Sequence, residues 1–298
     1  MIGNFSEFLK NNGCVYREFT PIANLSSIGI DTVVRMLVYP ENVEQFVAII
    51  DYLSEHNIKY KVLGNLSNVL FREKFFSGVV VKTTKIMRKS VAGNRVMADC
   101  GVIFASVIQN IAKLNLGGFE GLSGIPGSLG GMLQQNAGAY GYEISDRFIS
   151  AEIYDSNLKS VYRYAKDDMR FSYRSSVLKD RNLFVLSAEF EAIPTDKNDV
   201  LGQIKELSEK RKSAQPISQH SLGSVFKRIN GVSAGYYIDQ AGLKGLRVGG
   251  AEVSQKHAGF VVNIGDAVAD DILELIRIIK QRVFDKFGIM LEEEIEII

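Results

Sequence analysis

The segment from Gly117 to Gly141 constrains this chain more than any other, because nine of its 25 residues are glycine. Glycine lacks a Cβ atom, so it weakens helices and strands and instead permits left-handed turns and close backbone contacts. We therefore expect neither a helix nor a regular sheet here. Successive backbone N–H groups in such a loop form a concave anion site, and a pyrophosphate suits that chemistry. The segment predicts a phosphate-binding loop.

Two common phosphate-binding motifs are absent from this segment. It holds neither GxGxxG directly after a strand nor GxxxxGKS or GxxxxGKT. A Rossmann dinucleotide-binding domain and a P-loop domain are therefore disfavoured. The alternative is a glycine-rich packing loop with no ligand, which accounts less well for so many glycines.

Composition and charge exclude several other classes of protein. The 35 Lys and Arg residues balance 34 Asp and Glu, and a net charge of +1 predicts no general affinity for nucleic acid or an anionic membrane. No apolar run approaches the roughly 18 residues of a membrane span, and the first residues do not resemble a signal peptide. Two distant cysteines and three dispersed histidines predict neither a disulfide scaffold nor a metal site. We expect a cytoplasmic monomer.

The rest of the chain alternates between strand and helix patterns. Short apolar runs indicate strands at 33–39, 61–64, 78–82, 151–154, 183–190 and 260–264, and helical spacing indicates helices at 43–50, 104–114, 199–213 and 272–287. Composition shifts at 194–196, which predicts a boundary before the last third of the chain. A chain of 298 residues is expected to form several subdomains, and the class is α+β.

Several motifs follow one another in a fixed order. They are SGIPGS at 123–128, NAGAYG at 136–141, YRxS at 173–176, GSVFK at 223–227, AGLKG at 241–245, KHAxFVVN at 256–263 and LxxEI at 291–295. In this order they resemble the UDP-N-acetylenolpyruvoylglucosamine reductase (MurB) family, from about Ala23 to the end of the chain. The lack of an insertion between Arg174 and Ser224 resembles the shorter, type II form.

The resemblance implies a fold and a reaction. It implies the FAD-binding fold of the vanillyl-alcohol-oxidase (PCMH) type in two subdomains, at 1–82 and 83–194, with an α/β substrate-binding subdomain at 195–298. It implies that the enzyme uses FAD and NADPH to reduce UDP-N-acetylglucosamine enolpyruvate to UDP-N-acetylmuramate in peptidoglycan synthesis. No metal, nucleic acid or membrane partner is implied.

The resemblance also assigns the cofactor contacts to two segments of small and amide-bearing residues. Their backbone N–H groups and polar side chains suit a diphosphate. They are Gly64, Asn65, Ser67, Asn68, Gly124, Ile125, Pro126, Gly127, Ser128, Gly130, Gly131, Asn136, Ala137 and Gly138. Leu66 and Ile30 stand where the family prefers glycine, which leaves the affinity for FAD open. Taken alone, residues 64–68 predict only a turn after a strand.

Three residues match the family's catalytic set. Arg174 is implied to stabilise an enolate-like intermediate, Ser224 to protonate the α-carbon, and Glu294 to assist Arg174 at the substrate carboxylate. A serine hydroxyl is a weak acid, so Ser224 needs a relay through Lys227 or water. Without the resemblance these residues predict a surface arginine, a turn serine and one acid among four, with Glu293 the nearest alternative.

Lys227 and Tyr173 complete the expected substrate site. Lys227 is the first candidate for the UDP diphosphate, ahead of the basic run at 210–212, which is typical of a solvated helix face. His220 and His257 are assigned no role. Two alternatives stay open: a degenerate paralogue that binds flavin or nucleotide sugar without turnover, and another flavin oxidoreductase on the same fold.

Overall fold

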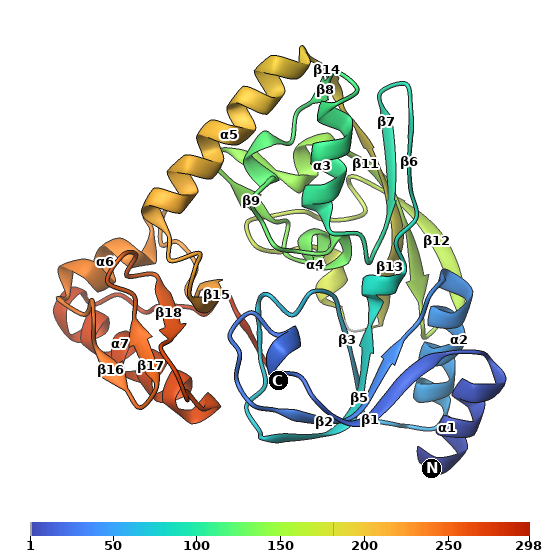
Figure 1. Cartoon of the computed structure of the whole chain (residues 1–298), viewed down its shortest axis with the longest axis horizontal. Coiled ribbons are helices and arrows are strands. Elements are labelled where there is room, and N and C mark those ends of the chain that lie inside the picture. The colour runs from blue at the N-terminus through green and yellow to red at the C-terminus, as the bar shows by residue number, and fades with distance from the viewer. Residues whose placement is uncertain (1, 181) are drawn as a thin grey trace. The chain divides into compact units, whose positions relative to one another are not determined.

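A computed structural model describes residues 2–180 and 182–298, and the chain divides into two compact units. Unit 1 is formed by Met1–Phe19, Arg35–Asn65 and Ser77–Glu209, and unit 2 by Thr20–Val34, Leu66–Phe76 and Lys210–Ile298. Each unit is therefore assembled from three separate stretches of chain (Figure 1).

The first sheet of unit 1 has four strands in the order β1–β2–β5–β3, with β3 and β5 parallel. Their bounds are Val15–Pro21, Val33–Tyr39, Phe75–Lys82 and Tyr60–Leu63. Helices α1 (Ile2–Asn11) and α2 (Val43–Glu55) lie together (Figure 1), with the Phe5 and Tyr52 ring centroids 5.2 Å apart. The strand, helix and strand predicted between residues 33 and 64 are confirmed.

The second sheet of unit 1 has five antiparallel strands in the order β12–β11–β13–β7–β6. Their bounds are Ser160–Ala165, Phe148–Asp155, Leu183–Glu191, Arg95–Asp99 and Lys89–Ala92. Helix α3 (Phe104–Ala112) buries its apolar face in the same core. A short pair, β8 (Leu116–Gly117) with β14 (Ile193–Pro194), precedes the long helix α5 (Lys197–Ala214). The predicted strands and helices of this region are confirmed.

The glycine-rich segment contains a short α-helix and a 3₁₀ turn at Glu120–Leu122, so the expectation of no helix there is wrong. Helix α4 (Leu129–Gln134) includes two glycines. Gly130 N donates to Cys100 O at 2.8 Å, and a Cβ on Gly130 would lie 3.3 Å from a Val185 side-chain carbon. Glycine at this position lets the helix pack closely on β7 and β13, which offsets its low helix propensity.

Unit 2 contains a four-stranded antiparallel sheet in the order β15–β18–β17–β16. The bounds of these strands are His220–Ser224, Phe260–Asn263, Ala251–Val253 and Arg247–Val248. Helix α7 (Ala269–Phe287) packs on β16, β17 and α6 (Ala234–Gln240), and Gly288 ends α7 at φ 68°. This helix and its glycine stop were predicted. Among the described residues, no helix is long and apolar enough to span a membrane.

The C-terminal strand of unit 2 is short. β19 (Glu296–Ile297) pairs in parallel with β4 (Val69–Leu70). The alternation of apolar and polar residues at 291–298 predicts a strand with Ile295 and Ile297 facing the core. Ile295 is buried, but Ile297 is 39% exposed. Because β19 pairs over only two residues, the pattern does not place both isoleucines inside.

Candidate cofactor and active site

Two segments distant in sequence meet in unit 1 at the predicted cofactor residues. Asn65 Nδ2 donates a hydrogen bond to Pro126 O at 2.8 Å. Gly64 packs so closely on Ser128 that a Cβ on Gly64 would lie 1.8 Å from Ser128 Oγ. Only glycine fits this contact. The turn after β3 and the glycine-rich loop therefore form one cluster of small residues, called the cradle below, in which the lack of side chains permits close approach of a ligand to the backbone.

A buried lysine supports this cradle, and sequence analysis missed it. Lys82 ends β5, is only 6% exposed, and donates from Nζ to Gly64 O at 3.0 Å. Within the described part of the chain, no carboxylate pairs with this ammonium, and burial lowers the pKa of Lys82 to about 8. A cation behind a loop of small residues favours an anionic ligand. The residues present therefore fit a cofactor that carries a diphosphate.

The other predicted cofactor residues of this turn, Ser67 and Asn68, belong to unit 2. Asn68 Nδ2 donates to Glu294 O at 3.1 Å, and Asn68 O accepts from Glu296 N at 2.9 Å. Asn68 thus holds the C-terminal segment in place. The cofactor roles of Ser67 and Asn68 stay predictions.

The two departures from the family's glycines have different structural settings. Leu66 is 3% exposed and has φ 49°, in the left-handed region that favours glycine. Ile30 lies in the core of unit 2, and the neighbouring Gly29 takes φ 69°. Leu66 therefore carries backbone strain, whereas the left-handed residue beside Ile30 is still a glycine.

Arg174 lies in a tight turn of unit 1. Ser172 and Ser175 exchange two backbone hydrogen bonds of 3.1 Å, and Arg174 between them has φ 53°. A left-handed conformation costs a residue other than glycine about 1–2 kcal/mol. Arg174 Nη2 donates to Gly138 O at 3.2 Å, and its Cζ lies 5.2 Å from the centroid of the Tyr173 ring. The turn directs the guanidinium towards these two partners.

The last three predicted cofactor residues lie beside this turn. Asn136 is 1% exposed, and its Nδ2 donates to Ser172 O at 3.2 Å. Ala137 and Gly138 follow, and Gly138 begins β9 (Gly138–Ala139), which pairs with β10 (Tyr142–Glu143). The segment 136–138 is therefore in contact with the Arg174 turn, and its cofactor role stays a prediction.

Ser224 and Glu294 are brought together by backbone pairing in unit 2. Ser224 is the last residue of β15, and its Oγ donates to Phe226 O at 3.1 Å. Glu294 N donates to Val225 O at 2.8 Å, so the C-terminal segment runs beside the residues that follow Ser224. The nearest alternative, Glu293, forms an ion pair with Lys280 at 2.8 Å. This pairing engages the Glu293 carboxylate, and the catalytic role of Glu294 stays a prediction.

Lys227 takes part in the same backbone pairing between the residues after Ser224 and the C-terminal segment. Its N–H donates to Glu292 O at 2.9 Å, and its ammonium forms an ion pair with the Glu292 carboxylate. The Lys227 side chain is 23% exposed and that of Glu292 is 71% exposed. A ligand phosphate would therefore have to compete with an exposed, weakly held carboxylate.

His257, which was given no role, lies near Ser224. A Cβ on Gly259 would lie 3.5 Å from Ser224 Oγ and 3.1 Å from His257 Nδ1. His257 Nδ1 accepts a hydrogen bond from Gly259 N at 3.1 Å, so its ring proton sits on Nε2. Burial lowers the pKa of His257, which favours this neutral form. His220 instead contacts Ser27 O at 3.3 Å.

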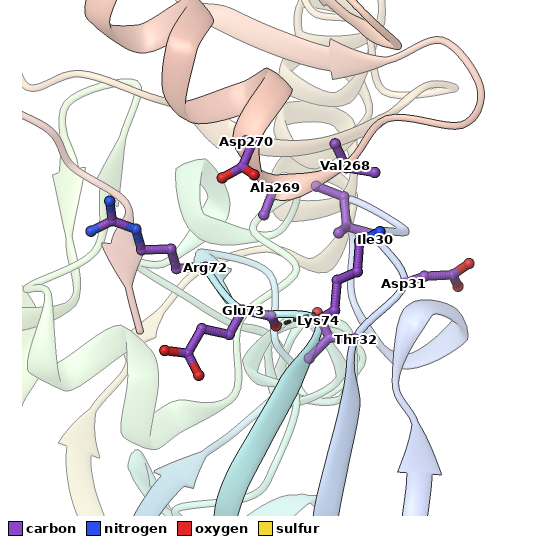
Figure 2. A pocket seen from close by; sticks show the side chains of 9 residues that line it. All are labelled: Ile30, Asp31, Thr32, Arg72, Glu73, Lys74, Val268, Ala269 and Asp270. Atoms are coloured by element: carbon purple, nitrogen blue, oxygen red, sulfur yellow. Dashed lines mark hydrogen bonds between the residues drawn. The ribbon is translucent and has the colours of Figure 1, made fainter.

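A small pocket in unit 2 lies among residues from three parts of that unit. Figure 2 shows Asp31, Arg72, Glu73, Lys74 and Asp270 around it, the last at the start of α7. None of the predicted site residues lines this pocket. Its basic and acidic groups are mixed, so their charges favour neither an anionic nor a cationic ligand.

Known proteins match this chain over almost its whole length. Residues 34–158 match an FAD binding domain, and residues 215–298 match the UDP-N-acetylenolpyruvoylglucosamine reductase C-terminal domain. The UDP-N-acetylenolpyruvoylglucosamine reductases of Caldicellulosiruptor bescii and Clostridium tetani are each 41% identical, over 99% and 100% of this chain and 94% and 96% of theirs. The crystal structure of the Thermus caldophilus enzyme (MurB) superposes with a TM-score of 0.80 and 30% identity, covering 95% of this chain and 98% of its own. The predicted fold class is confirmed.

Proposed function

Because the chain belongs to the UDP-N-acetylenolpyruvoylglucosamine reductase family, we propose that it reduces UDP-N-acetylglucosamine enolpyruvate to UDP-N-acetylmuramate. The chain is an FAD-dependent oxidoreductase that uses NADPH, and the reaction belongs to peptidoglycan precursor synthesis. The structural observation that supports the proposal is the close contact of Gly64 with Ser128, which brings the two predicted cofactor segments together.

The residues that would hold FAD are those of the cradle. The turn at Gly64 and Asn65 and the loop at 124–131 would bind the diphosphate, and the Lys82 ammonium would offset part of its charge. FAD held there would supply the hydride for the β-carbon of the enolpyruvyl group. The remaining chemistry belongs to side chains.

Arg174 would bind the carboxylate of the enolpyruvyl group. Its guanidinium presents two parallel N–H donors, which match a carboxylate and strengthen as negative charge develops on it during reduction. The turn that holds Arg174 fixes this cation before the substrate arrives, so little reorganisation is needed at the reacting centre. Tyr173, 43% exposed beside it, would contact the same substrate.

Ser224 would donate the proton to the α-carbon, and Glu294 would bind at the carboxylate end of the substrate. Ser224 Oγ donates to Phe226 O in this structure, so the hydroxyl would have to rotate away from this acceptor to deliver its proton. A relay through Lys227 or water would return a proton from solvent to Ser224 after each turnover. Lys227 would bind the UDP diphosphate in place of Glu292.

We further propose the finer features that the sequence predicts. The chain is of type II, because no insertion separates Arg174 from Ser224. Its three subdomains are 1–82, 83–194 and 195–298, and the C-terminal family match at 215–298, which follows the FAD-binding match, supports a separate last subdomain. It works in the cytoplasm as a monomer, and light scattering of the purified protein tests the monomer.

Half-reaction kinetics test the role of Ser224. In Ser224→Ala, bleaching of the flavin by NADPH should keep the wild-type rate, whereas reoxidation by the enolpyruvyl sugar should slow by about 10²-fold or more, because the proton donor is lost. Ser221→Ala, on the same strand, is the matched control and should reoxidise normally. Normal reoxidation of Ser224→Ala would show that another group donates the proton.

A further inference from the structure

A closed ring of hydrogen bonds surrounds the Arg174 turn. Arg174 Nη2 donates to Gly138 O at 3.2 Å, and Gly138 pairs with Glu143 across the β9–β10 hairpin. Glu143 Oε2 accepts from Asn136 Nδ2 at 2.9 Å. The same Nδ2 donates to Ser172 O at 3.2 Å, and Ser172 closes the turn that contains Arg174. The ring therefore leads from the guanidinium back to its own backbone.

The side-chain amide of Asn136 bonds in this ring through both its nitrogen and its oxygen. Its two N–H donors serve two acceptors, and its Oδ1 accepts from Ser145 N at 3.3 Å. The residue is 1% exposed and has φ 39°, a conformation that asparagine tolerates better than most residues. Removing its amide would leave buried polar groups without partners, and the Ser172 carbonyl would lose its tie to the hairpin.

Glu143 makes further contacts within the hairpin and the turn that follows it. Its carboxylate also accepts from the backbone of the following 3₁₀ turn, in a capping box with Asp146. A Cβ on Gly138 would lie 3.0 Å from Glu143 Cγ, so glycine at 138 lets the Glu143 side chain cross the hairpin. The hairpin turn has two left-handed residues, Tyr140 at φ 55° and Gly141 at φ 83°, as type I′ turns do.

We propose that Asn136 and Glu143 are positioning residues for Arg174. The left-handed backbone of Arg174 is unfavourable by itself, and strained conformations persist only where the surroundings fix them from several sides. The ring fixes this conformation at two points: Asn136 binds the backbone of the turn at Ser172 O, and Gly138 O binds the guanidinium. The inference rests on the proposed function for the role of Arg174. It assigns the Asn136 side chain to this turn instead of to the cofactor.

A double-mutant cycle tests the proposal on the full-length holoenzyme. Asn136→Ala should lower kcat for reduction of the enolpyruvyl sugar by about 10- to 100-fold, because a misplaced cation no longer meets the developing charge. Bleaching by NADPH and FAD content should not change. In an Arg174→Ala background the same substitution should cost less than about 3-fold, since residues that act through one another are not additive.

A second pair of variants separates positioning from general damage. Glu143→Gln keeps the oxygen that accepts from Asn136 and should stay near wild type, whereas Glu143→Ala should resemble Asn136→Ala. If Asn136→Ala does not fold, the effect of Glu143→Ala on kcat, measured in the wild-type and Arg174→Ala backgrounds, tests the proposal instead. Asn42→Ala is the matched control, because it removes an amide that caps α2 far from the turn in sequence, and kcat should not change.

Hydrogen exchange gives a readout that does not depend on turnover. The amides of Ser172 and Ser175 should exchange faster in Asn136→Ala than in the wild type or in Asn42→Ala. Unchanged exchange, an unchanged kcat, or an equal loss in the Arg174→Ala background would each overturn the proposal. If the wild type fails to reduce the enolpyruvyl sugar, the proposed function fails, and the exchange result still decides whether the ring holds the turn.

Discussion

Because Lys82 is buried, the free energy of unfolding should rise as the pH increases above about 8. The pKa of Lys82 is about 8 in the folded protein, against 10.5 for a free lysine side chain, because burial penalises the charged form. This difference corresponds to about 3 kcal/mol of folding free energy. The substitution Lys82→Met removes the titrating group and keeps a long apolar side chain.

The sign follows from the protons that each state binds. Below pH 8 both states are protonated, and the folded state bears the full cost of the buried charge. Between pH 8 and 10.5 the unfolded state binds more protons, so the free energy of unfolding rises with pH and the cost disappears. The difference in unfolding free energy, wild type minus Lys82→Met, should therefore increase by about 3 kcal/mol across this range.

Urea unfolding of the flavin-free protein, followed by circular dichroism at several pH values between about 7 and 10.5, measures this difference. Subtracting the variant removes the contribution of tyrosines that titrate over the same range. Lys85→Met, an exposed lysine three residues later, is the matched control and should show no such rise. A difference that stays flat with pH would refute the reasoning that Lys82 is a buried cation.

Substitutions at Lys82 and Gly64 probe the cradle, and a substitution at Leu66 probes backbone strain. Lys82→Met should weaken FAD binding in equilibrium dialysis while riboflavin, which lacks the diphosphate, binds as before; equal losses would exclude a role towards the phosphates. Gly64→Ala should lower FAD affinity at least about tenfold, because its Cβ meets Ser128, and adding Ser128→Gly should restore part of it. Leu66→Gly should destabilise by about 1–3 kcal/mol in urea, since lost burial outweighs relieved strain, and a gain in stability would contradict this.

The secondary structure was predictable because it depends on local patterns. The strand at 33–39 and the helix ending at Gly288 follow from the spacing of apolar residues and from the position of a glycine. Helix α4 was missed because its glycines are explained only by the sheet on which they pack. That contact joins residues far apart in the chain, and no local pattern contains it.

The candidate site was predictable only where motifs carried it. Ser224 and Glu294 were singled out by resemblance, and the structure adds the backbone pairing that joins their segments. Lys82 follows three valines in a buried strand, and this position was the available signal that its charge is buried. The ring through Asn136 and Glu143 links four loops and strands, so it becomes visible only in three dimensions.

The measurement that tests the central claim most directly is an anaerobic visible spectrum of the purified holoenzyme during two additions. NADPH should bleach the flavin band, and UDP-N-acetylglucosamine enolpyruvate should then restore it, with UDP-N-acetylmuramate as the product. A band that bleaches and does not recover would point to a different acceptor. A protein that binds no FAD even when FAD is supplied would contradict the account and favour a paralogue without this activity.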